Sequence, residues 1–379
     1  MMISKLPHIS TSIFTIMSKM ATDHNALNLS QGFPNFNSDP VLIDAVHKAM
    51  KDGHNQYAPM AGDLGLRVEI SEKIKALHQR RYHPETEITI TAGATQAIFT
   101  AIAATIYEGD EVIILTPAYD CYEPTIQLFG GTSVSVQLVA PFYRPDWELI
   151  ATKITAKTKM IIINSPHNPS GMVFSESDML QLQEIVQRHS LWVISDEVYE
   201  HIIFDDTIHQ SAARFETLAH RTFITASFGK TFHNTGWKVG YCVAPEFLMT
   251  EFRKVHQFNV FSVNHPVQKA LADYMKDPNC YLKLSGFYQQ KRDLFLSLLK
   301  DSRFKIIPSL GTYFQLLDYS DISEENDRKF TERLTKENGV ATIPTSVFNQ
   351  DQQDFRQIRV CFAKTAETLH KAAKILNSI

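Results

Sequence analysis

Five short runs of β-branched and aliphatic residues in the middle of the chain restrict its fold more than any other feature. They lie at 111–115 (EVIIL), 159–163 (KMIII), 191–195 (LWVIS), 222–226 (TFITA) and 239–244 (VGYCVA). These runs are apolar on both faces, which is typical of parallel strands buried beneath helices. Between them, 176–189 carries apolar residues at helical spacing and 95–109 is a second candidate helix. The pattern predicts an α/β fold with a mostly parallel open sheet and helices on its faces.

A chain of 379 residues is longer than one ordinary hydrophobic core requires. From about residue 265 its character changes to a long helical stretch, interrupted at Asp277-Pro278, and then to shorter elements. We therefore expect an N-terminal arm (1–44) that joins the small domain, a large domain (45–270) and a smaller α+β C-terminal domain (271–379).

Composition excludes several classes of function. Acidic residues outnumber basic ones by 41 to 37 and no basic run is present, so we expect no nucleic-acid partner. No segment approaches the roughly eighteen apolar residues of a membrane span, and the N-terminus lacks the apolar core of a signal peptide. The four cysteines show no Cys-x-x-Cys spacing, so we expect no metal site, no disulfide framework and a cytoplasmic setting.

Polar residues follow the predicted strands at the points where ligands bind in open α/β sheets, beyond the carboxyl ends of the strands. Tyr119 follows the first run and Asn168 the second. Asp196 and Tyr199 follow the third, and Lys230 follows the fourth. This order predicts one ligand site along a single edge of the sheet.

The segment TAGATQA (91–97) predicts an anion site in the same layer, because it follows the β-like run EITI and opens a helix. Backbone N–H groups at a helix N-terminus bind phosphate well. An ordinary helix cap, with the Thr95 hydroxyl as the capping group, is the alternative. The residues expected to contact a phosphate are Gly93, Ala94, Thr95, Ser227 and Lys238.

The stretch SFGKTFHNTGWK (227–238) indicates the kind of cofactor. A single loop lysine is ordinarily a solvated charge. If Lys230 forms a Schiff base with an aldehyde cofactor, however, a neighbouring cation and partial desolvation would lower its pKa and make it nucleophilic. Lys238 supplies that cation and would hold the cofactor's phosphate, and Gly229 would let the backbone pass close by. The implied cofactor is pyridoxal 5'-phosphate.

That cofactor needs three further groups, and the strand ends supply them. Its ring nitrogen needs a buried carboxylate, for which Asp196 is placed. Its phenolic oxygen needs hydrogen-bond donors, which Tyr199 and Asn168 can provide, and Tyr119 offers an aromatic ring for stacking. Each residue also has an ordinary structural interpretation: Asp196 as a helix cap, Tyr199 as a core residue and Asn168 as a turn residue. These separate interpretations do not explain why all of the residues follow strands in this order.

Four motifs, SFGKTFHNTGWKVGY, NSPHNPSG, SDEVYE and AGATQA, together resemble the class I/II aminotransferases of pyridoxal-phosphate fold type I. The segments LNLSQGFPNF, NQYAPMAGDLGLR and PSLGTYF are similar to the kynurenine/glutamine transaminase branch, and especially to bacterial methionine aminotransferases. The resemblance covers nearly the whole chain. A lysine at position 238 and a glycine at position 229, where other branches carry an arginine and a hydroxyl residue, also occur in this branch.

The resemblance implies a role for each matching residue. Lys230 would link to the cofactor and move the substrate's α-proton, while Asp196 would pair with the ring nitrogen and Tyr199 with the phenolic oxygen. Asn168 would contact both cofactor and substrate, and Arg359 in QIRVCFAK would bind the substrate carboxylate with a bidentate fork.

Two further positions carry implications from the resemblance. Gly32 would add a backbone contact to the substrate. Tyr57 would reach the phosphate from a second subunit, which implies a homodimer with shared active sites.

The implied activity is transfer of an amino group from an L-amino acid to a 2-oxo acid by a ping-pong mechanism. Aspartate-specific relatives hold the substrate's side-chain carboxylate with a second arginine from the neighbouring subunit, but the corresponding stretch QFNVFSVNHP (257–266) contains none. Phe14 and Phe261 would make the pocket apolar and aromatic. We therefore expect methionine as the amino donor, ahead of phenylalanine, tyrosine, glutamine and kynurenine, with aspartate a poor substrate.

Two alternatives share most of these residues. A carbon–sulfur β-lyase on the same fold would differ in what leaves after proton removal. A non-catalytic regulator that binds the cofactor would need a DNA-binding module, for which the N-terminal arm is too short.

Overall fold

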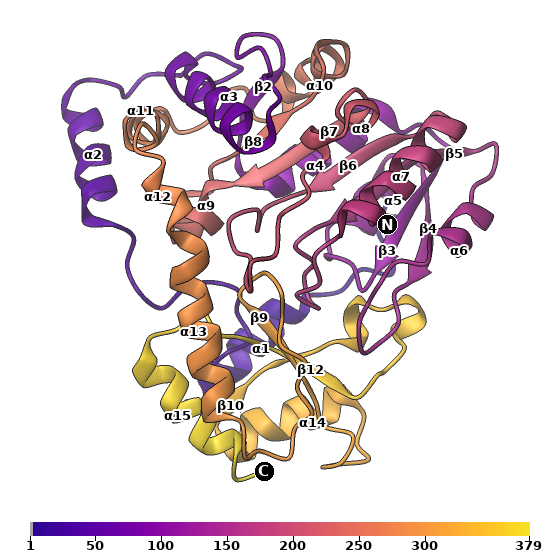
Figure 1. The fold of residues 1–379 in the computed structure, drawn as a ribbon, viewed down its shortest axis with the longest axis vertical. Coiled ribbons are helices and arrows are strands. Elements are labelled where there is room, and N and C mark those ends of the chain that lie inside the picture. The colour runs from indigo at the N-terminus through magenta and orange to yellow at the C-terminus, as the bar shows by residue number, and fades with distance from the viewer. Residues whose placement is uncertain (1–2) are drawn as a thin grey trace.

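The computed structural model describes residues 3–379, and a seven-stranded sheet dominates it (Figure 1). The strand order is β2-β8-β7-β6-β5-β3-β4. In that order the strands are β2 (Ile88–Thr91), β8 (Gly240–Val243), β7 (Thr222–Ser227), β6 (Trp192–Asp196), β5 (Thr158–Asn164), β3 (Glu111–Thr116) and β4 (Thr132–Gln137). The five strands from β7 to β4 are parallel, which confirms the predicted α/β class and the mostly parallel sheet.

Two features of this sheet differ from the sequence prediction. β8 runs antiparallel to both of its neighbours, although the run at 239–244 was expected to be a parallel strand. The connection from β7 to β8 contains only α9 (Phe228–Thr231) and the short helical turn at Thr235–Trp237, so it lacks a helix long enough to return along the sheet. β4 was not predicted, because Ser133 and Ser135 interrupt its apolar residues at an edge of the sheet.

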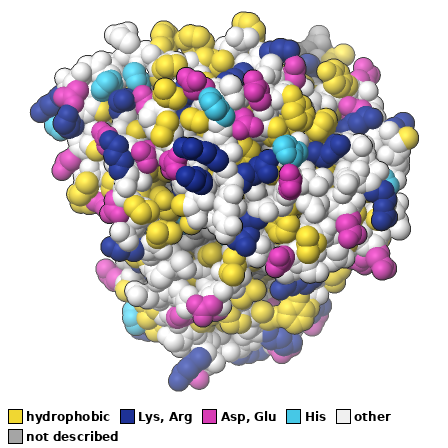
Figure 2. All heavy atoms as spheres, turned by 45° about the horizontal axis from the view of Figure 1, so that its top comes forward, with side chains coloured by type: hydrophobic (Ala, Val, Ile, Leu, Met, Phe, Trp, Pro, Cys, Tyr) yellow, Lys and Arg dark blue, Asp and Glu magenta, His cyan; other side chains and the backbone are white. Residues whose placement is uncertain are grey.

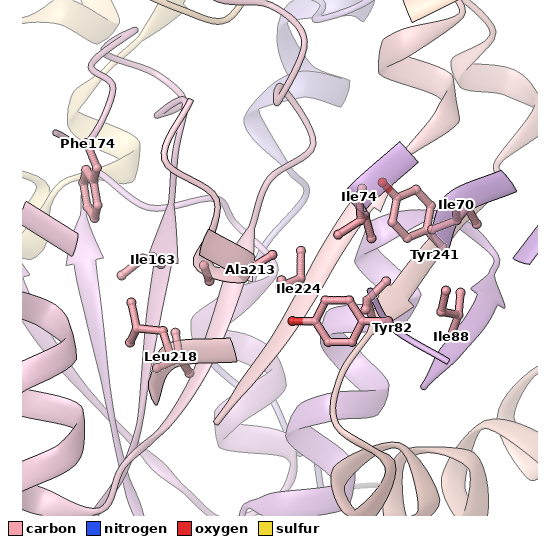
Figure 3. Close-up of a cluster of buried hydrophobic side chains, with 14 of the residues drawn as sticks. Ile70, Ile74, Tyr82, Ile88, Ile163, Phe174, Ala213, Leu218, Ile224 and Tyr241 are labelled. Atoms are coloured by element: carbon pink, nitrogen blue, oxygen red, sulfur yellow. The ribbon is translucent and has the colours of Figure 1, made fainter. Parts of the chain in front are cut away.

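Helices cover both faces of the sheet, and strand residues alternate between them. Ile113 and Ile161 belong to a core that includes α3 (Leu64–His78) and α7 (Glu176–His189), and Figure 3 shows part of this cluster. The neighbouring strand residues belong to a second core with α4 (Gly93–Thr105) and α10 (Glu246–Asn259). The predicted helix at 176–189 is confirmed. The helix expected at 95–109 begins two residues earlier and ends at Thr105, before the turn at Gly109 (φ +86°).

A smaller layer lies below the main sheet in Figure 1. Its antiparallel sheet has the order β11-β12-β9, and a two-stranded parallel pair joins β1 to β10. These strands are β1 (Leu27–Asn28), β9 (Phe314–Asp318), β10 (Val340–Ala341), β11 (Ile343–Pro344) and β12 (Gln357–Cys361). Residues of β1, β9, β10 and β12 share a separate core with α13 (Leu284–Leu298) and α15 (Ala366–Leu376), whereas Ile343 of β11 packs with Met17 and Phe348. We propose, as the sequence predicts, that this layer and the arm form the small domain.

The remaining α-helices pack around the two layers. They are α1 (Ile13–Asp23), α2 (Pro40–Lys51), α5 (Tyr122–Leu128), α6 (Trp147–Thr152), α8 (Glu216–Ala219), α11 (His265–Tyr274), α12 (Asn279–Leu282) and α14 (Asp327–Arg333). Of these, α5, α6 and α8 contribute to the cores of the main sheet. No helix within residues 3–379 is both long and apolar enough to cross a membrane. Acidic and basic side chains are interspersed over the face in Figure 2, in keeping with the net charge of −4.

Candidate active site

One pocket gathers thirteen of the fifteen predicted site residues at the carboxyl ends of the parallel strands. They are Phe14, Gly32, Gly93, Ala94, Thr95, Tyr119, Asn168, Asp196, Tyr199, Ser227, Lys230, Lys238 and Arg359. Tyr57 and Phe261 do not line this pocket and instead lie against each other, with ring centroids 5.4 Å apart. Segments from the arm, the main sheet and the small layer thus meet at one site.

Lys230 lies in α9, immediately after β7. Its Nζ donates hydrogen bonds to the Gly32 carbonyl oxygen (3.2 Å) and to the Tyr313 hydroxyl (2.9 Å). Burial, together with the smaller effect of the positive charges of Arg359 and Lys238, lowers the pKa of this lysine to about 8. A substantial share of the amine is therefore neutral, and hence nucleophilic, near physiological pH.

Asp196 ends β6 and is buried. Its carboxylate accepts hydrogen bonds from the Tyr122 hydroxyl (2.6 Å) and from the backbone N–H of Val198 (3.4 Å). Burial nevertheless raises the pKa of this carboxyl to about 6. No lysine, arginine or histidine within residues 3–379 forms an ion pair with it. A protonated ring nitrogen would supply the missing positive partner.

The N-terminus of α4 has the properties of an anion site. Its N-cap residue, Ala92, provides no side-chain hydrogen bond, so the alternative in which Thr95 caps this helix is wrong. A Cβ added to Gly93 (φ +76°) would lie only 3.3 Å from Cδ of Lys238, which shows how closely that side chain approaches the helix end. In the described part of the chain, the backbone N–H of Lys238 donates to the Thr235 carbonyl oxygen, but its side-chain ammonium forms no hydrogen bond or ion pair. The uncapped N–H groups and the adjacent ammonium fit a phosphate.

Arg359 in β12 is a second cation without a carboxylate partner among the described residues. It is only 1% exposed, and it donates to the Asn168 side-chain oxygen (2.8 Å) and to the Ser30 carbonyl (3.0 Å). Its Nε has no partner, and its guanidinium carbon lies 3.9 Å from the centroid of the Phe314 ring. A buried guanidinium held by neutral oxygens alone fits the carboxylate of an amino acid.

Three other predicted residues occupy the walls of the pocket. Tyr199 is buried, and burial raises the pKa of its phenol well above the ordinary value, so its hydroxyl stays protonated and able to donate. The Tyr119 ring meets Tyr122 edge to face, with centroids 6.0 Å apart. Ser227 ends β7 next to α9.

Sequence reasoning missed several residues at this site: Gln31, Tyr122, Asn164, Tyr313 and Phe314. The strand-end rule could have found Asn164, which ends β5 and accepts a hydrogen bond from the backbone of Asn168 (2.8 Å). Tyr122 lies three residues after the predicted Tyr119. Tyr313 and Phe314 lie in the segment PSLGTYF, which carries part of the family resemblance, but no role at the site was predicted for either residue.

Together these residues match the chemical groups of pyridoxal phosphate. The helix N-terminus and Lys238 match its phosphate, Asp196 matches its ring nitrogen, and Lys230 matches its aldehyde. An α/β sheet that carries this set at its carboxyl edge defines a fold type I pyridoxal-phosphate enzyme, with Arg359 left for a carboxylate substrate.

Comparisons with known proteins identify the family. Residues 24–376 match the family model for aminotransferases of class I and II, and the chain belongs to that family. It is 46% identical over 377 residues to the methionine aminotransferase of Escherichia coli K12, covering 99% of this chain and 98% of that protein. It is 33% identical to human kynurenine–oxoglutarate transaminase 3, covering 99% and 89% of the two chains.

Solved structures agree with this assignment. A crystal structure of an E. coli protein, reported to identify a methionine aminotransferase function, has a TM-score of 0.98 with 46% identity and full coverage of both chains. An N-succinyldiaminopimelate aminotransferase from Mycobacterium tuberculosis has a TM-score of 0.96 with 34% identity, also over both full chains. The chain is thus a pyridoxal-phosphate-dependent aminotransferase acting on amino acids and 2-oxo acids, which confirms the predicted family, fold type, cofactor and enzyme class.

Proposed function

We propose that this aminotransferase uses L-methionine as its preferred amino donor, with other apolar and aromatic amino acids next and aspartate poor. One observation carries the proposal: within the described residues the pocket is lined by three Lys or Arg side chains, and each already has a proposed partner. Lys238 is assigned to the phosphate, Lys230 to the reacting carbon and Arg359 to the substrate's α-carboxylate. No cation is left for a carboxylate on the substrate's side chain.

The walls near Arg359 favour an apolar side chain instead. The rings of Phe14 and Phe314 lie 5.2 Å and 3.9 Å from the guanidinium carbon. Burying an unpaired carboxylate among such groups costs several kcal/mol, whereas apolar surface gains about 25 cal/mol for each Å² removed from water. Thioethers also pack well against aromatic edges. The E. coli relative at 46% identity is itself named a methionine aminotransferase.

The site residues divide the chemical work. Arg359 and Asn168 bind and orient the substrate carboxylate, so that the α-hydrogen faces Lys230. Lys230, as a neutral amine, accepts the α-proton and later returns it at another carbon. Asp196 holds the proton on the ring nitrogen, and the bound cofactor supplies the electron sink and carries the amino group between half-reactions.

A single-turnover experiment tests the proposed substrate. The holoenzyme, without a 2-oxo acid, is mixed with methionine, phenylalanine or aspartate, and the loss of the cofactor's visible absorbance is followed. We expect the largest rate constant per unit concentration with methionine. Pyruvate and ammonia are measured in parallel with cystathionine, since their release as the dominant reaction would favour the β-lyase instead.

We also propose that the protein is a homodimer with shared active sites. Tyr57 is 81% exposed and Phe261 is 49% exposed, yet their rings pack edge to face outside the pocket of their own chain. Such an aromatic pair on the surface fits contact with a second copy, whose phosphate site Tyr57 would complete.

Complementation between subunits tests this arrangement. Lys230→Ala and Tyr57→Ala variants are each weakly active or inactive alone, but hybrid dimers contain one intact site. Random mixing should therefore restore about a quarter of the wild-type activity. No gain on mixing, with hybrid dimers verified by mass, would contradict shared sites.

We also propose that the protein is located in the cytoplasm. This location is supported by the four cysteines, which are all unpaired.

A further inference from the structure

Three segments far apart in the sequence meet at the amine of Lys230. Gly32 belongs to the N-terminal arm, Lys230 follows β7, and Tyr313 precedes β9. The Lys230 Nζ lies 2.9 Å from the Tyr313 hydroxyl oxygen and 3.2 Å from the Gly32 carbonyl oxygen. The Tyr313 hydroxyl in turn donates its proton to the same Gly32 carbonyl. The three groups therefore form a closed triangle of hydrogen bonds.

The position of the Tyr313 hydroxyl is fixed by its surroundings. The side chain is fully buried, and its ring packs against Tyr199 (centroids 5.2 Å apart), Tyr288 (5.7 Å) and Phe314 (5.0 Å). Burial also raises the pKa of the phenol well above its ordinary value, so the group stays a hydroxyl. Because its proton is committed to Gly32, a lone pair of its oxygen is free to accept from Lys230.

The position of the Gly32 carbonyl is also fixed by close packing. A Cβ at this position would lie 2.7 Å from Cζ of Phe314, a distance that side chains do not tolerate. A glycine therefore lets the arm bring its carbonyl into contact with both Tyr313 and Lys230.

We propose that Tyr313 is a positioning residue for the nucleophile: its hydroxyl and the Gly32 carbonyl take both N–H groups of the neutral Lys230 amine and so direct its lone pair away from themselves. A tetrahedral amine has one lone pair once two hydrogens and Cε are placed, so fixing both hydrogens fixes the direction from which it accepts a proton. This inference rests on the proposed role of Lys230. It adds a group that orients that lysine, from a segment the sequence analysis did not connect with catalysis.

The orientation matters most when Lys230 removes the substrate's α-proton. Proton transfer depends steeply on the alignment of donor and acceptor, and a misplacement of about 1 Å can cost about 100-fold in rate. Without the Tyr313 hydroxyl, one N–H group loses its acceptor and the amine can rotate about its Cε–Nζ bond. Binding of the substrate carboxylate at Arg359 is unaffected.

The test compares Tyr313→Phe with Tyr288→Phe as a matched control. Both variants remove one buried phenol hydroxyl and keep the ring, but the Tyr288 hydroxyl bonds to Nδ1 of His233 (3.0 Å) and does not touch Lys230. The holoenzymes are mixed with L-methionine, and the single-turnover rate is fitted for its maximum and its half-saturating concentration. Methionine deuterated at the α-carbon verifies that the measured step is proton removal.

We expect Tyr313→Phe to lower the maximal rate about 10- to 100-fold and to change the half-saturating concentration less than about threefold. The control should stay within about threefold of the wild type in both constants. A wild-type maximal rate in Tyr313→Phe overturns the proposal, as does an equal loss in both variants. If Lys230→Ala keeps a normal rate in the same assay, Lys230 does not remove the α-proton, and the proposed function of Lys230 is wrong rather than the role of Tyr313 alone.

Discussion

Replacing Asp196 by asparagine should stabilise the cofactor-free protein while disabling the enzyme. The folded protein raises the pKa of this carboxyl from its ordinary value of 3.8 to about 6, chiefly by burial. A difference of about two pKa units corresponds to about 3 kcal/mol between the charged and neutral forms. The charged carboxylate therefore costs the apoprotein stability at pH 7, and a neutral asparagine of the same shape removes that cost.

The sign of the pH dependence follows from proton linkage. Between pH 6 and pH 4 the folded protein binds the Asp196 proton more tightly than the unfolded chain does, so this group makes the wild type more stable as the pH falls through that range. The Asp196→Asn variant has no carboxyl group to protonate, so its stability does not increase in this way as the pH falls. We expect the variant apoprotein to be more stable by about 1–3 kcal/mol at pH 7, and the two proteins to converge near pH 4.

Chemical denaturation of both apoproteins at several pH values between 4 and 8 measures this difference. The same variant should lose transamination by about 100-fold or more, because the ring nitrogen loses its charged partner. An Asp196→Asn apoprotein that is less stable than the wild type at pH 7, or a difference that does not change with pH, would refute the reasoning.

Three further predictions concern the cations of the pocket. Lys230→Ala should abolish transamination and the covalent cofactor adduct that borohydride reduction traps, as measured by mass spectrometry; retained activity would remove this lysine from its role. Arg359→Lys should raise KM for all amino acids by about tenfold or more, since an ammonium cannot form a bidentate pair, while cofactor absorbance is kept; unchanged KM values would contradict that assignment. Because the pKa of Lys230 is lowered to about 8, the rate at which the apoprotein captures added cofactor should rise about tenfold per pH unit and level off near pH 8. A stopped-flow profile that keeps rising toward pH 10 would show an ordinary lysine.

Much of the site was predictable because parallel strands bring their carboxyl ends to one edge. Asp196 and Lys230 each lie directly after or at the end of a buried strand, so a local pattern was sufficient to place them together. The role of Arg359 came only from its motif, because it lies on a strand of the other layer.

The rest depends on contacts that no local pattern encodes. Gly32 and Tyr313 meet at Lys230 only after the arm and the small layer have packed against the main sheet. The direction of β8 depends on the length of its connection to β7, which is too short for a parallel crossover. An apolar run in the sequence does not indicate in which direction the strand runs. β4 was missed for a related reason, since a half-polar edge strand lacks the continuous apolar run of a buried one.

The central claim is that this aminotransferase has a carboxylate-binding arginine for the backbone end of its substrate and an apolar pocket for the side chain. The most direct measurement is a set of kcat/KM values for methionine, phenylalanine, glutamine and aspartate with one fixed 2-oxo acid acceptor, because this ratio reports discrimination in the transition state. We predict the highest value for methionine and a value at least about 100-fold lower for aspartate, which corresponds to about 3 kcal/mol. Aspartate equal to or better than methionine would contradict the account of the pocket.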